Sequence, residues 1–284
     1  MWLVLLLATA SCSRHVCYPQ EGGIFFQLEP LNWDLPDSQL FLSALRLAGK
    51  HASGGYGLAW RKARRQQVAD KLRGHAKMSQ APMIKELEDA GLEYKSFWIN
   101  NSLYVKGAPC HFQLLLLSKF ADRVEEIVPD GVVAHIPKPP STTPSLSGPI
   151  WSQLIRLAVE NEGQVPWNLE MINVEEAWKV SRGDRITVAS IDTGVVASHP
   201  GLAKSYRGKD ATKDAHGYHW FDPKGKSKTP DDPCGHGTHT MGTICGESWG
   251  VAPGVTWITA RGCTEQGCTQ HDLLASAQWV MCPT

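Results

Sequence analysis

The strongest constraint on the fold is an apolar run, residues 186–191, that ends in Asp192-Thr193-Gly194. Forty-four positions after the aspartate, His236 stands between two glycines and opens a run of small residues, 237–244. The β-branched apolar run predicts a buried strand, and the small-residue run predicts a helix. Alternating strands and helices favour a parallel α/β sheet, whose functional side chains gather at the carboxyl ends of strands. We expect Asp192 at such an end.

The two halves of the chain differ in their patterns. In the second half we predict strands at 218–222 and 255–260 and helices at 151–160, 174–180, from 237 onwards, and at 272–281. In the first half we predict strands at 24–34, 96–105 and 125–136 and helices at 60–90 and 114–124. The first half is therefore predicted to be a small α+β module.

The chain divides into four predicted segments. Residues 137–150 are rich in proline and serine and stay extended, which marks a linker between a module at 20–136 and a domain at 151–284. The apolar run 2–10 is far shorter than the roughly 20 residues of a membrane-spanning helix. With the small residues at 8–10 it predicts a secretory signal peptide at 1–13, and the alternative is a buried terminal strand or helix.

Composition excludes some partners. With 28 basic and 28 acidic side chains the chain has no net charge to attract nucleic acid or an anionic membrane surface. Hydrophobic content of 42% predicts a globular protein rather than a disordered one.

The chain has eight cysteines, and export would allow disulfides between them. We predict one pair, Cys263–Cys268, because the four residues between them include Gly267 and can close a tight loop. A metal clip is the competing interpretation, but a single C-x4-C without a second cysteine pair is weak evidence for zinc.

Asp192 and His236 are the candidate catalytic residues. A serine hydroxyl is a weak nucleophile and needs an adjacent general base, and histidine suits this role because its ordinary pKa is near neutral. A buried carboxylate then holds the imidazole tautomer and stabilises the imidazolium. Taken singly, such an aspartate is usually a helix cap and such a histidine a packed residue. Their order and glycine-rich setting favour catalysis instead.

The stretches 188–202, 231–246 and 250–258 resemble the subtilases, serine endopeptidases, and among them bacillopeptidase F-like members. The resemblance runs from about Trp167 to Cys282. It implies an incomplete subtilisin-like parallel sheet flanked by helices, with Asp192 and His236 as two members of an Asp-His-Ser relay. It also implies protein or peptide substrates, no cofactor for the chemistry, and room for structural calcium with no ligands assigned.

The module at 20–136 is similar to the inhibitory propeptides of this group, on residues 79–82 and 97–105. In the family such a propeptide assists folding, caps the substrate cleft and is then removed. The resemblance therefore implies a secreted zymogen with an intramolecular propeptide partner.

The sequence departs from the family after Cys282. No Gly-Thr-Ser-Met-Ala-like nucleophile turn, no oxyanion asparagine and no substrate-pairing edge strand are recognised before Thr284. We therefore expect a truncated endopeptidase precursor that is inactive as written. The second hypothesis is a non-catalytic, propeptide-like protease inhibitor or pseudoenzyme.

Two further motifs are rejected as sites. Residues 246–250 have G-x-S-x-G spacing, but an esterase elbow follows a strand and opens a helix, whereas this one precedes a Val-Ala-Pro-Gly turn. Zinc-binding residue types also occur between 234 and 245, but without a His-Glu-x-x-His run or paired C-x2-C; they are Cys234, His236, His239 and Cys245.

Overall fold

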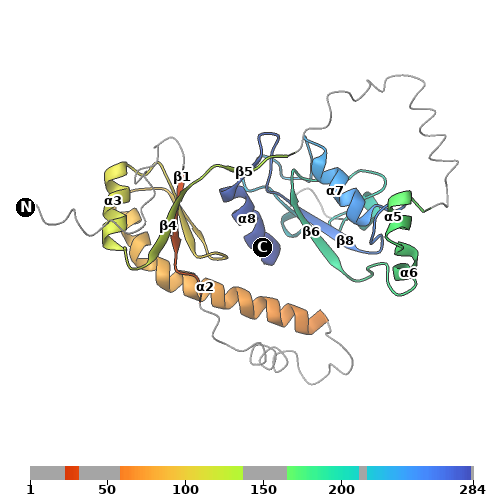
Figure 1. The fold of residues 1–284 in the computed structure, drawn as a ribbon, viewed down its shortest axis with the longest axis horizontal. Helices are drawn as coiled ribbons and strands as arrows, with labels where there is room; N and C mark the ends of the chain where they lie inside the picture. The colour runs from red at the N-terminus through yellow and green to blue at the C-terminus, as the bar shows by residue number, and fades with distance from the viewer. Residues whose placement is uncertain (1–22, 32–57, 137–164, 211–215, 283–284) are drawn as a thin grey trace, which may run out of the picture. The chain divides into compact units, whose positions relative to one another are not determined.

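The computed structural model describes residues 23–31, 58–136, 165–210 and 216–282 (Figure 1). The predicted signal peptide, the predicted linker and the predicted helix at 151–160 lie outside these residues. The chain forms two compact units, residues 1–131 and 132–284.

The amino-terminal unit contains an antiparallel sheet with strand order β2-β3-β1-β4. Its elements are β1 (Gly23–Leu28), α2 (Leu58–Asp89), β2 (Tyr94–Phe97), β3 (Ser102–Lys106), α3 (Cys110–Lys119) and β4 (Val124–Pro129). Side chains of both helices pack on this sheet, and their shared core includes Phe26, Leu87, Leu103 and Leu116. The predicted single strand at 96–105 is wrong. It is a hairpin of β2 and β3, because Asn101 adopts the left-handed conformation, with φ 53°, and turns the chain.

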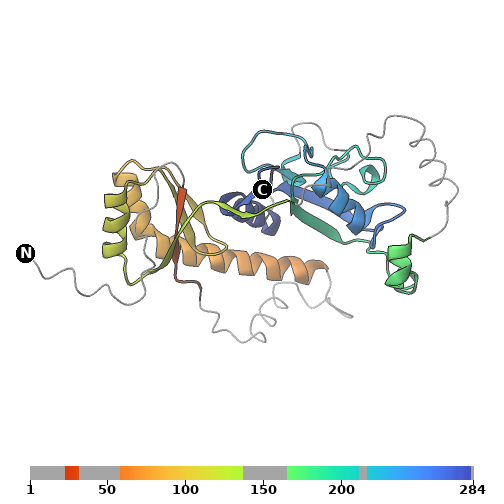
Figure 2. The ribbon, with the colours of Figure 1, turned by 45° about the horizontal axis from the view of Figure 1, so that its top comes forward.

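The carboxyl-terminal unit contains a three-stranded parallel sheet in the order β6-β8-β7. Strands β6 and β8 lie side by side in Figures 1 and 2. The elements are β5 (Val132–Ala134), α5 (Trp167–Met171), α6 (Val174–Trp178), β6 (Thr187–Asp192), η1 (Ala203–Ser205), η2 (His216–Tyr218), β7 (Trp220–Phe221), α7 (His236–Cys245), β8 (Thr256–Arg261), β9 (Cys268–Thr269) and α8 (Gln270–Met281). The predicted α/β fold with a parallel sheet is confirmed.

Helices α7 and α8 cover opposite faces of this sheet. Trp257 of β8 packs with Met241 of α7, whereas its neighbour Ile258 packs with Trp279 of α8. Successive side chains of a strand point to opposite faces, so these two contacts place the helices on either side. The sheet is covered on both faces, as its apolar strands require.

A second, antiparallel strand pair joins β5 to β9, with Val132 opposite Thr269 and Ala134 opposite Cys268. The sequence did not predict β9, because two residues after a cysteine turn carry no strand pattern of their own.

Among the helices that the structure describes, none is long and apolar enough to cross a membrane.

Candidate active site

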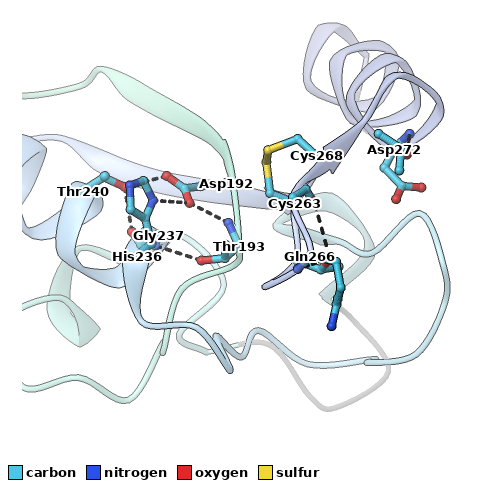
Figure 3. The surroundings of a disulfide bond; sticks show 12 residues. Asp192, Thr193, His236, Gly237, Thr240, Cys263, Gln266, Cys268 and Asp272 are labelled. Carbon is cyan, nitrogen blue, oxygen red and sulfur yellow. Dashed lines mark hydrogen bonds and ion pairs between the residues drawn. A yellow bond between two sulfur atoms is a disulfide. The ribbon is translucent and has the colours of Figure 1, made fainter. Parts of the chain in front are cut away.

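Asp192 and His236 come together at the carboxyl end of the parallel sheet. Asp192 is the last residue of β6, and His236 is the first residue of α7. Their side chains join Asp192 Oδ1 to His236 Nδ1 at 2.7 Å (Figure 3). A gap of 44 residues in the sequence thus becomes one hydrogen bond. This happens because the strand end and the helix start meet at the same edge of the sheet.

Further donors fix the orientation of the Asp192 carboxylate. The backbone N–H of Thr193 donates to Oδ1 at 2.7 Å, and the hydroxyl of Thr240 donates to Oδ2 at 3.0 Å. The Asp192 side chain is 13% exposed and that of His236 is 31% exposed. The carboxylate is therefore held inside the unit, while part of the imidazole faces solvent.

This arrangement selects one tautomer of a neutral imidazole. An ionised carboxylate only accepts hydrogen bonds, so Nδ1 of His236 must carry the proton that Asp192 receives. The other ring nitrogen, Nε2, then keeps its lone pair. No hydrogen bond to Nε2 occurs among the described residues. The pair can therefore accept a proton at Nε2, and the carboxylate stabilises the imidazolium that results.

Two glycines allow the strand end and the helix start to pack backbone against backbone. Gly194 has φ +110°, and a Cβ there would lie 2.0 Å from the carbonyl oxygen of Asp231. A Cβ at Gly237 would lie 2.0 Å from the carbonyl oxygen of Gly194. A larger residue at Gly237 would push α7 away from the end of β6, and one at Gly194 would push away the loop that precedes α7. The glycines that drew attention in the sequence thus set the close approach of Asp192 and His236.

The structure joins Cys263 and Cys268 in a disulfide, five positions apart, immediately after β8 (Figure 3). Both cysteines are buried. The loop between them is closed by hydrogen bonds between Thr264 and Gly267. The backbone N–H of Cys263 also donates to the carbonyl oxygen of Asp192 at 3.0 Å. The loop thus contacts the backbone of Asp192 at one cysteine and carries β9 at the other.

Three other cysteines, Cys234, Cys245 and Cys282, are free thiols. Burial raises the pKa of the Cys245 thiol to about 11, so this thiol is not a nucleophile at neutral pH. Within the described ranges, no group of three His, Cys, Asp or Glu side chains could hold a metal ion.

Sequence reasoning missed three residues of this site: Thr193, Thr240 and Asp232. Thr240 lies four positions after His236, one helical turn along α7, so the helix period could have found it. Asp232 lies three positions before Gly235, the residue that precedes α7, so the usual rule for a helix cap would not have found it.

Comparison with known proteins agrees with this geometry. The model of the family described as "Subtilase family" matches residues 183–283. Bacillopeptidase F of Bacillus subtilis is 28% identical over 232 residues, which is 78% of this chain and 16% of that protein. An intracellular serine protease of Paenibacillus polymyxa is 35% identical over 38% of this chain and 33% of its own length. The minor extracellular protease Vpr of Bacillus subtilis is 40% identical over 32% of this chain and 12% of its own.

The chain therefore spans a third or less of the length of these relatives. The family match covers the end of β6, the start of α7 and the disulfide loop. The part of the chain that brings Asp192 and His236 together matches the model of the subtilase family.

Proposed function

We propose that Asp192 and His236 form the proton relay of an endopeptidase that hydrolyses peptide bonds in proteins. The observation that carries this proposal is the 2.7 Å contact between Asp192 Oδ1 and His236 Nδ1, which leaves Nε2 available. The match of residues 183–283 to the subtilase family supports it. The chemistry of the relay needs no cofactor.

In this proposal Nε2 of neutral His236 takes the proton of a serine hydroxyl while the serine oxygen attacks the scissile carbonyl carbon. Asp192 holds the ring in place and stabilises the imidazolium by its charge. The Nε2 proton then passes to the leaving amine as the carbon–nitrogen bond breaks. We place the serine in a segment outside these 284 residues, because no nucleophile turn of the family type is recognised within them.

We further propose that the amino-terminal unit acts as an inhibitory propeptide of an exported precursor. Its chain continues directly into β5, which pairs antiparallel with β9 beside the disulfide loop. Main-chain pairing of this kind is a common way to bind an extended peptide. In this proposal β9 is an edge strand on which an extended peptide binds. The expectation that the sequence contains no substrate-pairing edge strand would then be wrong.

The test of the relay begins with the reading frame beyond the codon for Thr284. The proposal expects a continuation that encodes a Gly-Thr-Ser-Met-Ala-like turn and a product that hydrolyses casein. In that product, His236→Ala and Asp192→Asn should each lower kcat by about 10⁴-fold or more, a magnitude taken from the known subtilisin relay rather than derived for this chain. A product with full activity after His236→Ala would refute the relay.

A second candidate function is inhibition of a subtilase by the chain itself, and the β5–β9 pairing is the observation that favours it. Purified chain would be added to a subtilisin-type peptidase, and hydrolysis of a peptide substrate would be followed. The inhibitor function expects loss of activity that Val132→Pro relieves, because proline at this position distorts an extended pairing strand. A chain that inhibits no such peptidase excludes this candidate.

A further inference from the structure

The carboxylate of Asp232 accepts five hydrogen bonds from the two segments that carry the catalytic pair. Oδ1 accepts from the hydroxyl of Thr193 at 2.7 Å and from the backbone N–H groups of Gly235 and Cys234 at 2.9 and 3.2 Å. Oδ2 accepts from the backbone N–H and the hydroxyl of Thr238, at 2.8 and 2.7 Å. Few side chains in a folded protein satisfy so many donors at once, which shows that this carboxylate organises its surroundings.

Asp232 stands in for the missing cap of α7. The residue before the helix is Gly235, whose φ is +83° and which has no side chain to accept from the first amides. An uncapped helix start leaves backbone N–H groups without partners. Asp232 Oδ2 takes the amide of Thr238, and its negative charge is favourable at the positive end of the helix. The first turn of α7, which carries His236, is therefore fixed by Asp232.

The same carboxylate also holds the chain that follows Asp192. The hydroxyl of Thr193, a residue that is 1% exposed, donates a hydrogen bond to Asp232 Oδ1. The Thr193 oxygen in turn accepts from the backbone N–H of Gly237 at 3.0 Å. A continuous path of hydrogen bonds thus runs from the helix start through Thr193 to Asp232. The residues on either side of this path, Asp192 and His236, are the two that must stay 2.7 Å apart.

We propose that Asp232 is a positioning residue that sets the hydrogen bond between Asp192 and His236. Its importance for catalysis rests on the proposed function, while its effect on the Asp192–His236 bond does not. Asp232 touches neither side chain of the pair in any contact that the structure describes, so it acts through Thr193 and the first turn of α7.

The experiment follows the Nδ1 proton of His236 by NMR in the whole 284-residue chain labelled with ¹⁵N-histidine. His236→Gln assigns the signal by its disappearance, and Asp192→Asn shows that the signal reports the bond to Asp192. In Asp232→Asn one acceptor oxygen becomes a donor group facing other donors. We expect the Nδ1 proton to exchange with water about tenfold faster than in the parent chain, because Thr193 and the first turn of α7 are no longer held together.

Asp222→Asn is the matched control. Asp222 also accepts two backbone N–H bonds, from Lys224 and Ser227 at 3.0 Å each. Its other described contact is an ion pair with Arg261, so its carboxylate contacts neither the Asp192 nor the His236 side chain among the described residues. We expect this variant to keep the parent exchange rate even where it lowers stability. Equal acceleration in Asp222→Asn and Asp232→Asn would mean a general loss of stability and would overturn the proposal.

A folded Asp232→Asn chain with the parent exchange rate would also overturn it. Should that variant fail to fold, Thr193→Val decides the matter, because it removes the bridging hydroxyl while Asp232 can still cap α7. An unchanged rate in Thr193→Val then refutes the proposal. Failure of the proposed function alone looks different: a complete product that is inactive although the NMR effects of all variants are as expected.

Discussion

The two units each contain a network of polar groups with little exposure, but they use it differently. In the amino-terminal unit Gln80 and Asn101 are 1% and 3% exposed and bond to each other at 3.1 Å. Asn101 also accepts from Ser79, and Gln80 accepts from Ser96. This network fixes the turn between β2 and β3 against α2. The side chains of Gln80 and Asn101 are buried among protein partners, so the network contributes shape rather than reactivity.

In the carboxyl-terminal unit the network of Asp192 and Asp232 reaches a histidine that is partly exposed. Every oxygen of the two carboxylates has a described donor. Nε2 of His236 has none among the described residues. Similar hydrogen bonds therefore have two uses. A network whose polar atoms all have protein partners makes the fold rigid, whereas a network that leaves one nitrogen available holds a proton acceptor in place.

The largest expected effect comes from exchanging a glycine for alanine, which should act in opposite directions in the two units. Gly237→Ala places a Cβ against the Gly194 carbonyl oxygen, so α7 must move and the Asp192–His236 bond must break. We expect a loss of about 3 kcal/mol in unfolding free energy, at the upper end for overpacking, together with loss of the His236 Nδ1 proton signal. Gly74→Ala in α2 is the control, because a Cβ there meets nothing within 4 Å. It should raise stability by about 0.5–1 kcal/mol.

Both effects can be measured by urea denaturation and NMR. A Gly237→Ala chain that keeps the proton signal would show that the close approach of the two backbones is not needed for the pair.

The next effect should be confined to the amino-terminal unit. Gln80→Leu removes the buried amide and leaves Ser96 and Asn101 short of partners, so we expect a loss of about 1–3 kcal/mol. Gln66→Leu on the same helix is the control, since the one contact that the described residues give the Gln66 side chain is an exposed hydrogen bond to Asp70. Hydrogen exchange of β1 and β3 amides would report the change. Equal protection in both variants would contradict a structural role for the Gln80 network.

Removing the disulfide should have a smaller effect, in the carboxyl-terminal unit alone. Its loop is short, so the chain-entropy model gives Cys263→Ser with Cys268→Ser a cost of about 2 kcal/mol. We also expect faster hydrogen exchange at β9, which the disulfide anchors. Urea denaturation with and without a reducing agent measures the stability change. A reducing agent that destabilises the double-serine variant as much as the parent would exclude this disulfide as the cause.

The smallest effect is the pH dependence that Asp272 contributes. Burial pushes the pKa of Asp272 upward, but hydrogen bonds and charge from His271 and Lys224 outweigh it and leave the pKa below its ordinary value. A folded-state pKa below the unfolded one, about 3.9, gives stability that is present above that pH. This stability is lost as the pH falls through the folded-state pKa.

Asp272→Asn should therefore flatten the acid side of the stability curve of the carboxyl-terminal unit. Denaturation midpoints at pH 3 to 6 measure it. Parallel curves for the variant and the parent would show that Asp272 does not contribute to the pH dependence of stability.

The sequence determined the features that depend on local backbone geometry. Gly237 has no room for a side chain beside the backbone of Gly194, and Gly194 has none beside the backbone of Asp231. These glycines led directly to Asp192 and His236. The spacing of Cys263 and Cys268 and the alternating strands and helices were equally local. Residue chemistry and short spacings are enough to predict such features, and the parallel sheet followed from them.

Only the tertiary structure decided what depends on long-range pairing. Val132 lies in the strand predicted at 125–136, but no local pattern marks Thr269 as a strand or as the residue opposite Val132. In the sequence Asp232 resembles any acidic residue before a helix, and only the fold shows that the Thr193 hydroxyl donates to its Oδ1. The physical reason is that these contacts join segments whose separation is set by the whole sheet. A single segment of sequence therefore carries no record of its partner.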